Sequence, residues 1–229
     1  MMPPSQYNYS FFHIAKDSTI TLLVERYKTL RLQALSIAPT SFSSSYQIES
    51  ELSNTEWITR LTADGKETFV CAATPIQSYQ SPELGDTIWV AQLTLRGPQT
   101  REEFTLPVDS GQKIPREDEQ EELWQMLSLF TLPDHRGQGL GKSLCQEALN
   151  YLKSYRDHPR MICVRLMVKP ENYITVALYR QLGFIEAGKC TLAEALIANG
   201  DADLLPKDIS GEKYTARTGL IMISEISRW

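Results

Sequence analysis

The stretch that decides the fold is "LSLFTLPDHRGQGLGKSLCQEAL", residues 127–149. An almost continuously apolar run over 122–132, typical of a buried strand, leads into it, and a helix is predicted to follow over 140–156. Glycines alternate at 137, 139 and 141, so backbone amides can approach a ligand without a Cβ in the way. The first amides of a helix lack partners within the helix and favour an anion. The stretch therefore predicts a strand, a phosphate-type binding loop and a helix.

Two nucleotide-binding loops do not fit this stretch. A Walker A loop needs a glycine five residues before Gly141, and that residue is Arg136. A dinucleotide fingerprint needs a third glycine where this chain has Lys142 or Leu144. The pattern that fits is Arg-x-x-Gly-x-Gly, which begins at Arg136. A plain tight turn also uses glycines, and the loop alone leaves that alternative open.

The composition bounds the class of protein. The chain has 229 residues, 42% of them hydrophobic, and a net charge of −5, which argues against nucleic acid as the main partner. It has no signal-peptide pattern, and no apolar run approaches the ~20 residues that span a membrane. We expect a cytoplasmic protein with no membrane partner and no metal. No CxxC pair occurs, so we expect reduced, mostly buried thiols at Cys71, Cys145, Cys163 and Cys190.

Hydrophobic patterns predict alternating strands and helices, and hence an α/β protein with a mixed sheet. The predicted strands lie at 9–15, 68–73, 87–95, 122–132, 161–168, 184–190 and 218–226, and the predicted helices at 18–37, 44–63, 140–156 and 173–182. Residues 97–121 are polar and acidic, and they read either as a solvated loop or as a lip over a substrate site. A second polar loop is expected over 200–216.

A second signature follows, "NYITVALYRQLGFIEAG" at 172–188. The two stretches together resemble the GCN5-related N-acetyltransferases (GNAT), and the second matches that family at Asn172, Ala177, Tyr179, Gly183 and Phe184. The resemblance implies one GNAT domain over 1–229 with an α/β (α+β) fold, in which helices flank a mixed central sheet of about seven strands. It places the acetyl-CoA-binding core at about 122–188, around a splayed central pair of strands, and a polar insertion at about 97–121.

The resemblance also implies acetyl-CoA as the acetyl donor and assigns residues to it. The pyrophosphate would lie on the amides of the glycine loop: Arg136, Gly137, Gln138, Gly139, Leu140, Gly141, Lys142 and Ser143. The pantetheine arm would bond to the backbone of Leu129, Phe130 and Thr131, and the Leu129 amide would polarise the thioester carbonyl. Asn172 would lie near the cofactor or an ordered water, or cap a helix, or do both.

The implied chemistry is direct attack of an amine on the thioester in a ternary complex. Tyr179 matches the tyrosine that gives a proton to the leaving thiolate in many members, or it only packs beside the cofactor. Some members carry a glutamate base eleven residues before the motif arginine, and this chain has Gln125 there. A glutamine cannot take a proton but could orient a water. His135 is expected to be exposed and not catalytic.

The acceptor is expected to be a small-molecule or peptide amine, and the protein a monomer or homodimer. In this family residues like 27–42 and the stretch after Cys190 shape the acceptor site. The acidic run 116–122 reads either as an attraction for a cationic amine or as a solvated face. The alternative function is a non-catalytic acyl-CoA-binding module, because Gln125 is not a base.

Overall fold

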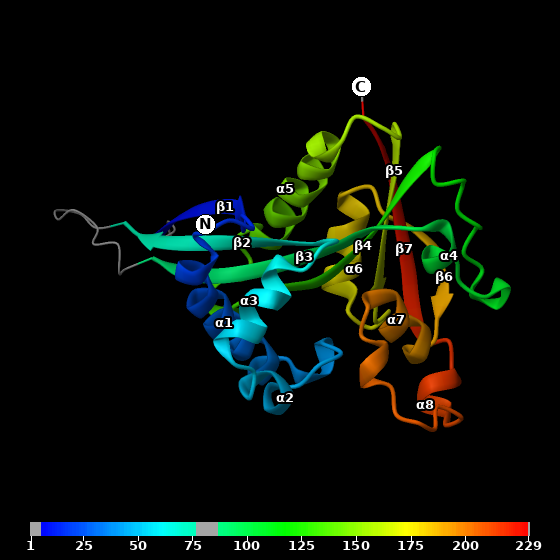
Figure 1. Cartoon of the computed structure of the whole chain (residues 1–229), viewed down its shortest axis with the longest axis horizontal. Helices are drawn as coiled ribbons and strands as arrows, with labels where there is room; N and C mark the ends of the chain where they lie inside the picture. Colours follow the sequence, from blue (N-terminus) through cyan, green and yellow to red (C-terminus); the bar gives the residue numbers. More distant parts are fainter. Residues whose placement is uncertain (1–5, 77–86, 229) are drawn as a thin grey trace. The chain divides into compact units, whose positions relative to one another are not determined.

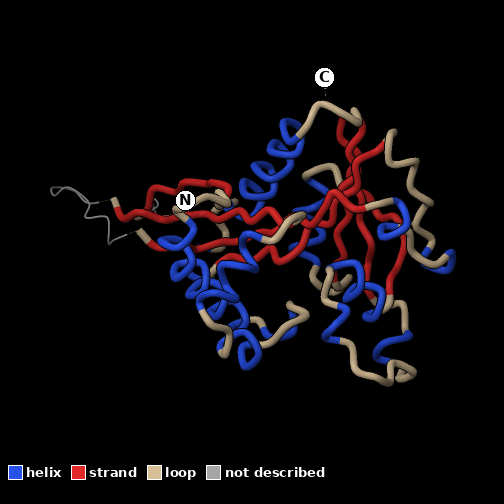
Figure 2. The backbone as a smooth tube through the Cα atoms, viewed as in Figure 1, coloured by secondary structure: helices blue, strands red, loops and turns tan. Residues whose placement is uncertain are grey.

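The computed structural model describes residues 6–76 and 87–228. Its strands form one seven-stranded mixed sheet in the order β1-β2-β3-β4-β5-β7-β6 (Figures 1 and 2). The predicted α/β class with a mixed sheet of about seven strands and flanking helices is therefore confirmed. The strands are β1 Tyr7–His13, β2 Lys66–Pro75, β3 Ile88–Gln99, β4 Glu121–Thr131, β5 Met161–Val168, β6 Ile185–Cys190 and β7 Gly219–Ser227.

The helices are α1 Ile20–Ile37, α2 Tyr46–Ser50, α3 Asn54–Thr62, α4 Arg101–Phe104, α5 Leu140–Tyr155, α6 Tyr173–Gln181, α7 Leu192–Asn199 and α8 Glu212–Thr215. The chain divides into two compact units. One comprises Met1–Thr94 with Ser128–Ala148, and the other Leu95–Leu127 with Leu149–Trp229. Strands β3 and β4 and helix α5 run from one unit into the other. The single domain over 1–229 stays a prediction.

In the first unit, β1 pairs antiparallel with β2 from Tyr7↔Pro75 to His13↔Phe69. Helices α1 and α3 pack together beside these strands (Figure 1), and their apolar faces meet around Tyr27, Leu30 and the fully buried Trp57. Burial of these faces supplies most of the helices' stability, as in other amphipathic helices.

The predicted single helix over 44–63 is two helices. Ser53 begins a new one because its side chain and that of Glu56 cap each other's backbone N–H groups, at 3.3 and 2.7 Å. The first of the two, α2, carries Glu49, which is completely buried. The Arg31 guanidinium donates to its carboxylate at 3.0 and 2.8 Å, and Arg60 lies 3.1 Å away. Burial alone would raise the pKa of Glu49, yet these two arginines hold the pKa below its ordinary value.

In the second unit, β4 pairs in parallel with β5, and β7 lies antiparallel between β5 and β6. The 97–121 segment is mostly exposed, but short elements and a few buried residues anchor it to the sheet. Strand β3 continues into it, a capping box at Thr100 starts α4, and Phe104 at the end of α4 is buried against Leu123 and Cys163. The polar loop expected over 200–216 contains a short 3-10 turn and α8.

The four cysteines are all free and buried, as predicted. Burial raises the pKa of Cys71, Cys145 and Cys163 to about 12 and that of Cys190 to about 11, so the thiols are neutral at physiological pH. Within residues 6–76 and 87–228, no helix combines the length and apolar character that a membrane crossing requires.

Candidate functional site

Strand β4 stops pairing with β5 six residues before its own end. Its pairing with β5 runs from Glu121↔Met161 to Gln125↔Arg165, whereas the strand continues to Thr131. Ser128 lies within this continuation with φ 60°, in the left-handed region that costs a non-glycine residue roughly 1–2 kcal/mol. Such local strain gathers at functional sites. The kink directly precedes Leu129, the residue whose amide was assigned to the thioester carbonyl.

Gln92 of β3 supports the kink and was missed by the sequence analysis. Its side chain is fully buried, and its Nε2 donates to the carbonyl of Ser128 at 3.4 Å. No described residue partners its Oε1. One signal could have found it: Gln92 interrupts the otherwise apolar run "IWVAQL", where a polar side chain needs a buried partner.

The glycine loop is an open cradle in front of α5. Gly137 and Gly139 have φ 75° and 76°, and a Cβ built on either would meet no heavy atom within 4 Å. Helix α5 begins at Leu140, which is buried and anchors the turn, and the Ser143 amide already bonds to the Gly139 carbonyl at 3.0 Å. The amides before Ser143 therefore face the loop side of the helix start, where anions bind.

Some side chains around the cradle contact the end of β4, and others are exposed to solvent. Arg136 Nε donates to the Thr131 carbonyl at 2.9 Å, and its guanidinium lies 5.5 Å from the Phe130 ring. The Arg136 side chain therefore braces the start of the loop against the end of β4. Phe130 is buried and Leu129 and Thr131 are half-buried, whereas Gln138, Lys142 and Ser143 are exposed and Gly141 is half-buried. The assignment of all these residues to the cofactor stays a prediction.

His135 is buried, so the expectation that it is exposed is wrong. Only 5% of it is accessible, and its Nδ1 lies 3.0 Å from the Tyr9 hydroxyl. Its ring packs edge-on against Tyr7 at 5.0 Å between centroids. Two tyrosines on β1 therefore hold the start of the glycine loop. The sequence gives no sign of this contact, because the partners lie 126 positions apart.

This arrangement predicts that stability falls at low pH. Burial lowers the pKa of His135 below its ordinary value of 6.5, against the opposite effect of Asp134. The unfolded chain therefore takes up the proton first as pH falls through 6.5, and the folded state loses stability in that range. Urea unfolding at pH 7.5 and pH 5 should show a larger loss for the wild type than for His135→Asn. Equal losses would contradict the prediction.

In the second unit, the 172–188 signature forms α6 and the start of β6. The Asn172 side chain caps α6 by accepting from the Thr175 amide at 3.4 Å, so the cap reading is confirmed. Tyr179 is 6% exposed and its ring lies 5.6 Å from that of Phe184. Gly183, with φ 86°, makes the turn between them. The roles of Asn172 toward the cofactor and of Tyr179 as a proton donor stay predictions.

Gln125 lies at the last paired position of β4 and is completely buried. Its Oε1 accepts from Arg165 Nε at 2.7 Å, and its Nε2 donates to Asn199 Oδ1 at 3.1 Å. Both ends of the amide are thus engaged by protein groups, and water orientation by Gln125 stays a prediction. Arg165 was missed, although its charge in the apolar run "MICVRLMV" is a signal, because a buried charge needs partners.

Three carboxylates of the acidic run 116–122 contact other groups of the protein. Glu117 pairs with Arg101 at 2.6 Å, and Glu121 accepts from the Arg116 amide at 3.2 Å. Glu122 is buried and paired with Arg228 at 2.7 Å. These three carboxylates therefore serve the fold, which disfavours the reading of the run as an attraction for a cationic amine.

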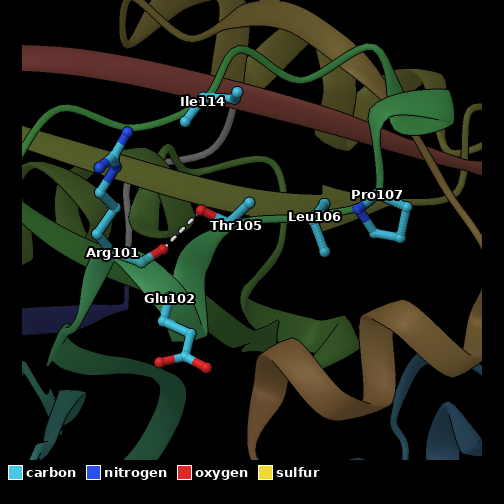
Figure 3. A pocket seen from close by; sticks show the side chains of 6 residues that line it. All are labelled: Arg101, Glu102, Thr105, Leu106, Pro107 and Ile114. Carbon is cyan, nitrogen blue, oxygen red and sulfur yellow. Dashed lines mark hydrogen bonds between the residues drawn. The ribbon is translucent and has the colours of Figure 1, made fainter.

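A shallow surface hollow of about 620 Å³ lies in the 97–121 segment (Figure 3). Its lining is Arg101, Glu102, Thr105, Leu106, Pro107 and Ile114. It contains neither the glycine loop nor any predicted catalytic residue, and we assign it no part in the chemistry. In the part of the chain that the structure describes, no three His, Cys, Asp or Glu side chains are grouped to hold a metal ion.

The fold resembles solved acetyltransferases. A GNAT-family acetyltransferase from Streptococcus pneumoniae is 13% identical, with 96% of this chain and 100% of that chain covered and a TM-score of 0.56. Arabidopsis thaliana NAA60 in complex with acetyl-CoA is 13% identical over 96% and 99%, with a TM-score of 0.54. A phosphinothricin acetyltransferase from Sinorhizobium meliloti in complex with AcCoA is 13% identical over 96% and 89%, with a TM-score of 0.53.

No protein of curated function matches the chain in sequence. The family profile described as acetyltransferase (GNAT) domain matches residues 86–186, a range that contains the glycine loop and most of the second signature. The resemblance predicted from the two signatures is thereby confirmed for this segment, and residues 86–186 carry a GNAT acetyltransferase domain.

Proposed function

We propose that the protein is an N-acetyltransferase that moves an acetyl group from acetyl-CoA to an amine by direct attack in a ternary complex. The observation that carries the proposal is the open cradle of left-handed glycines at the start of α5. Backbone amides there, with the positive end of the helix dipole, suit the pyrophosphate of coenzyme A. The acceptor is a small-molecule or peptide amine, and the acetyl-CoA complexes of fold relatives support the choice of donor.

The kinked end of β4 supplies the second part of the site. In the proposal, backbone groups of Leu129, Phe130 and Thr131 bond to the pantetheine arm. The Leu129 amide, which follows the left-handed Ser128, polarises the thioester carbonyl. Gln92 contributes to this geometry in the proposal, because its side chain donates to the Ser128 carbonyl. A preorganised donor of this kind is worth ~3 kcal/mol of barrier where such donors have been removed.

Proton transfer completes the proposed reaction. An acceptor amine with a pKa of about 10 is mostly protonated at neutral pH and must lose a proton before it attacks. Gln125 cannot take it, so a water chain or a base from another part of the chain does so. The leaving thiolate, whose free thiol has a pKa of about 8.5, receives a proton from the Tyr179 hydroxyl.

A second candidate is an acyl-CoA-binding module without catalysis. The engaged Gln125 amide, where some GNAT enzymes carry a base, favours it. The purified chain should be mixed with acetyl-CoA and a panel of amino acids, peptides, polyamines and small amines, with free thiol as the readout. Release that depends on an acceptor supports the enzyme, whereas tight binding of acetyl-CoA without release across the panel supports the binding module.

The cradle itself predicts that Gly139→Val weakens coenzyme A binding by about tenfold or more, a change of ~1.4 kcal/mol. The new side chain occupies the open space into which the phosphates must come. Calorimetry measures the dissociation constant. Gly65→Val is the matched control, because Gly65 has φ 68° and so carries the same backbone strain away from the loop. Equal affinity in the two variants would refute the assignment of the loop.

A further inference from the structure

Two arginines of the second unit, Arg165 and Arg96, lack an acidic partner among the described residues, and Arg165 contacts Gln125, the position of a catalytic base in some GNAT enzymes. Arg165 is fully buried on β5, at the register position opposite Gln125 of β4. Arg96 is half-buried on β3. The two are close enough for the charge of Arg96 to act on the pKa of Arg165. Arg165 thus brings a buried positive charge to the last paired position of β4 and β5.

The partners of Arg165 are all neutral. Its guanidinium donates to Gln125 Oε1 at 2.7 Å, to the Phe104 carbonyl at 2.5 Å and to Gln112 Oε1 at 3.2 Å. It lies 3.8 Å from the centre of the Phe104 ring. Its Nη2 is buried and has no hydrogen-bond partner among the described residues. An arginine has five N–H donors, and those on Nη2 are left unsatisfied by the described residues.

Arg96 likewise pairs with no acidic side chain among the described residues. Its Nη1 donates to the Ala198 carbonyl at 3.2 Å, and its Nε lies 2.6 Å from the place of a Cβ at Gly200. Neighbouring Asn199 is half-buried and gives its Oδ1 to Gln125, which leaves its amide NH2 as a donor. Arg96 and Asn199 are both partly exposed, and Gln125 links Asn199 to the buried Arg165.

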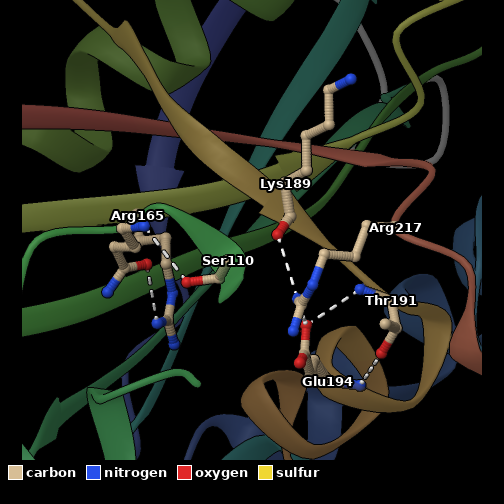
Figure 4. A network of polar contacts seen from close by, with 7 residues as sticks. Ser110, Arg165, Lys189, Thr191, Glu194 and Arg217 are labelled. Carbon is tan, nitrogen blue, oxygen red and sulfur yellow. Dashed lines mark hydrogen bonds and ion pairs between the residues drawn. The ribbon is translucent and has the colours of Figure 1, made fainter. Parts of the chain in front are cut away.

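A nearby arginine, Arg217, has the acidic partner that partly buried arginines usually have. Arg217 donates to the Glu194 carboxylate at 2.5 Å in the network of Figure 4, where Arg165 is also drawn. Neither Arg96 nor Arg165 forms an ion pair within 4.0 Å in the described part of the chain. Burial lowers the pKa of Arg165 to about 10, and Arg96 pushes it the same way, but the group stays charged at neutral pH. A buried charge without a counter-charge is costly.

A glutamate at position 125 would neutralise Arg165, and this chain has Gln125. We propose that Arg96, Asn199 and the underlying Arg165 form a subsite for a carboxylate carried by the acceptor amine. The acceptor then belongs to the class of free amino acids and related amino carboxylates. This inference rests on the proposed acetyl transfer. The carboxylate is the missing counter-charge, and two charge-assisted hydrogen bonds orient the amine.

The experiment compares each free amino acid with its C-terminal carboxamide as acceptor. For the wild type we expect kcat/KM to be about tenfold or more higher for the acid. A hydrogen bond to a charged group is stronger than a neutral one, and the difference in free energy corresponds to about tenfold in an equilibrium constant. In Arg96→Gln the ratio should fall to about one. In Gln125→Glu it should fall as well, because the new carboxylate pairs with Arg165. Arg217→Gln, which removes an arginine that already has its acid, should keep the wild-type ratio.

The outcomes separate the inference from the proposed function. Amides that react as well as acids, or a ratio unchanged in both Arg96→Gln and Gln125→Glu, would overturn the carboxylate subsite while acetyl transfer stands. A second readout needs no turnover: calorimetric binding of N-acetylglycine and N-acetylglycinamide in the presence of coenzyme A. Tighter binding of the acid that is lost in Arg96→Gln supports the subsite even where no acceptor reacts. Equal binding of the two probes overturns it.

Discussion

Replacing Glu122 by alanine is expected to lower the free energy of unfolding by about 3–5 kcal/mol. The Glu122 side chain is 1% exposed and receives hydrogen bonds from Arg228 at 2.7 Å and from Trp124 Nε1 at 2.6 Å. Arg156 adds an ion pair at 3.0 Å. The variant leaves Arg228, whose side chain is only 4% exposed, as a buried charge without its acidic partner on β4. Urea unfolding at neutral pH measures the loss.

An exposed ion pair provides the control. Arg180 and Glu186 are bonded at the surface, with side chains 61% and 50% exposed. Surface pairs of this kind contribute about 0–1 kcal/mol, so Glu186→Ala should change the unfolding free energy little. If Glu122→Ala costs no more than Glu186→Ala, the buried network does not hold this unit together.

Tyr179→Phe is expected to lower kcat by about 100-fold or more, the range reported for loss of a general acid. The substitution removes one hydroxyl and keeps the ring that packs against Phe184 at 5.6 Å. The dissociation constant for acetyl-CoA should therefore stay close to that of the wild type. Steady-state release of free thiol with a saturating acceptor gives kcat, and calorimetry gives the affinity. An unchanged kcat would leave Tyr179 a packing role.

The sequence predicts the parts of the fold that depend on local pattern. Apolar runs mark the strands. The spacing of Arg136, Gly139 and Gly141 identifies the glycine loop, which is open at the start of α5 in the structure. Helix α7 was not predicted, because it is short and the polar stretch 200–216 follows it directly. A capping box at Thr191 and Glu194 starts it, and this pattern is readable in the sequence.

What the sequence could not predict depends on contacts between distant residues. No turn residue in the sequence marks the left-handed Ser128, whose carbonyl accepts a hydrogen bond from the buried Gln92 on another strand. Burial of His135 requires Tyr9, and the role of Arg165 requires the folding of Phe104 and Gln112 onto β5. The 97–121 segment looked solvated because its few buried residues are scattered among many charges.

The proposed acetyl transfer is tested most directly by following a labelled acetyl group from acetyl-CoA to an acceptor. The chain is incubated with acetyl-CoA labelled in the acetyl group and with the panel of amines, and the acceptors are analysed by mass spectrometry. We expect the label on the nitrogen of an acceptor, with an equal amount of free coenzyme A, and slower labelling with Tyr179→Phe. Tight binding of acetyl-CoA with no label on any amine of the panel would contradict this expectation.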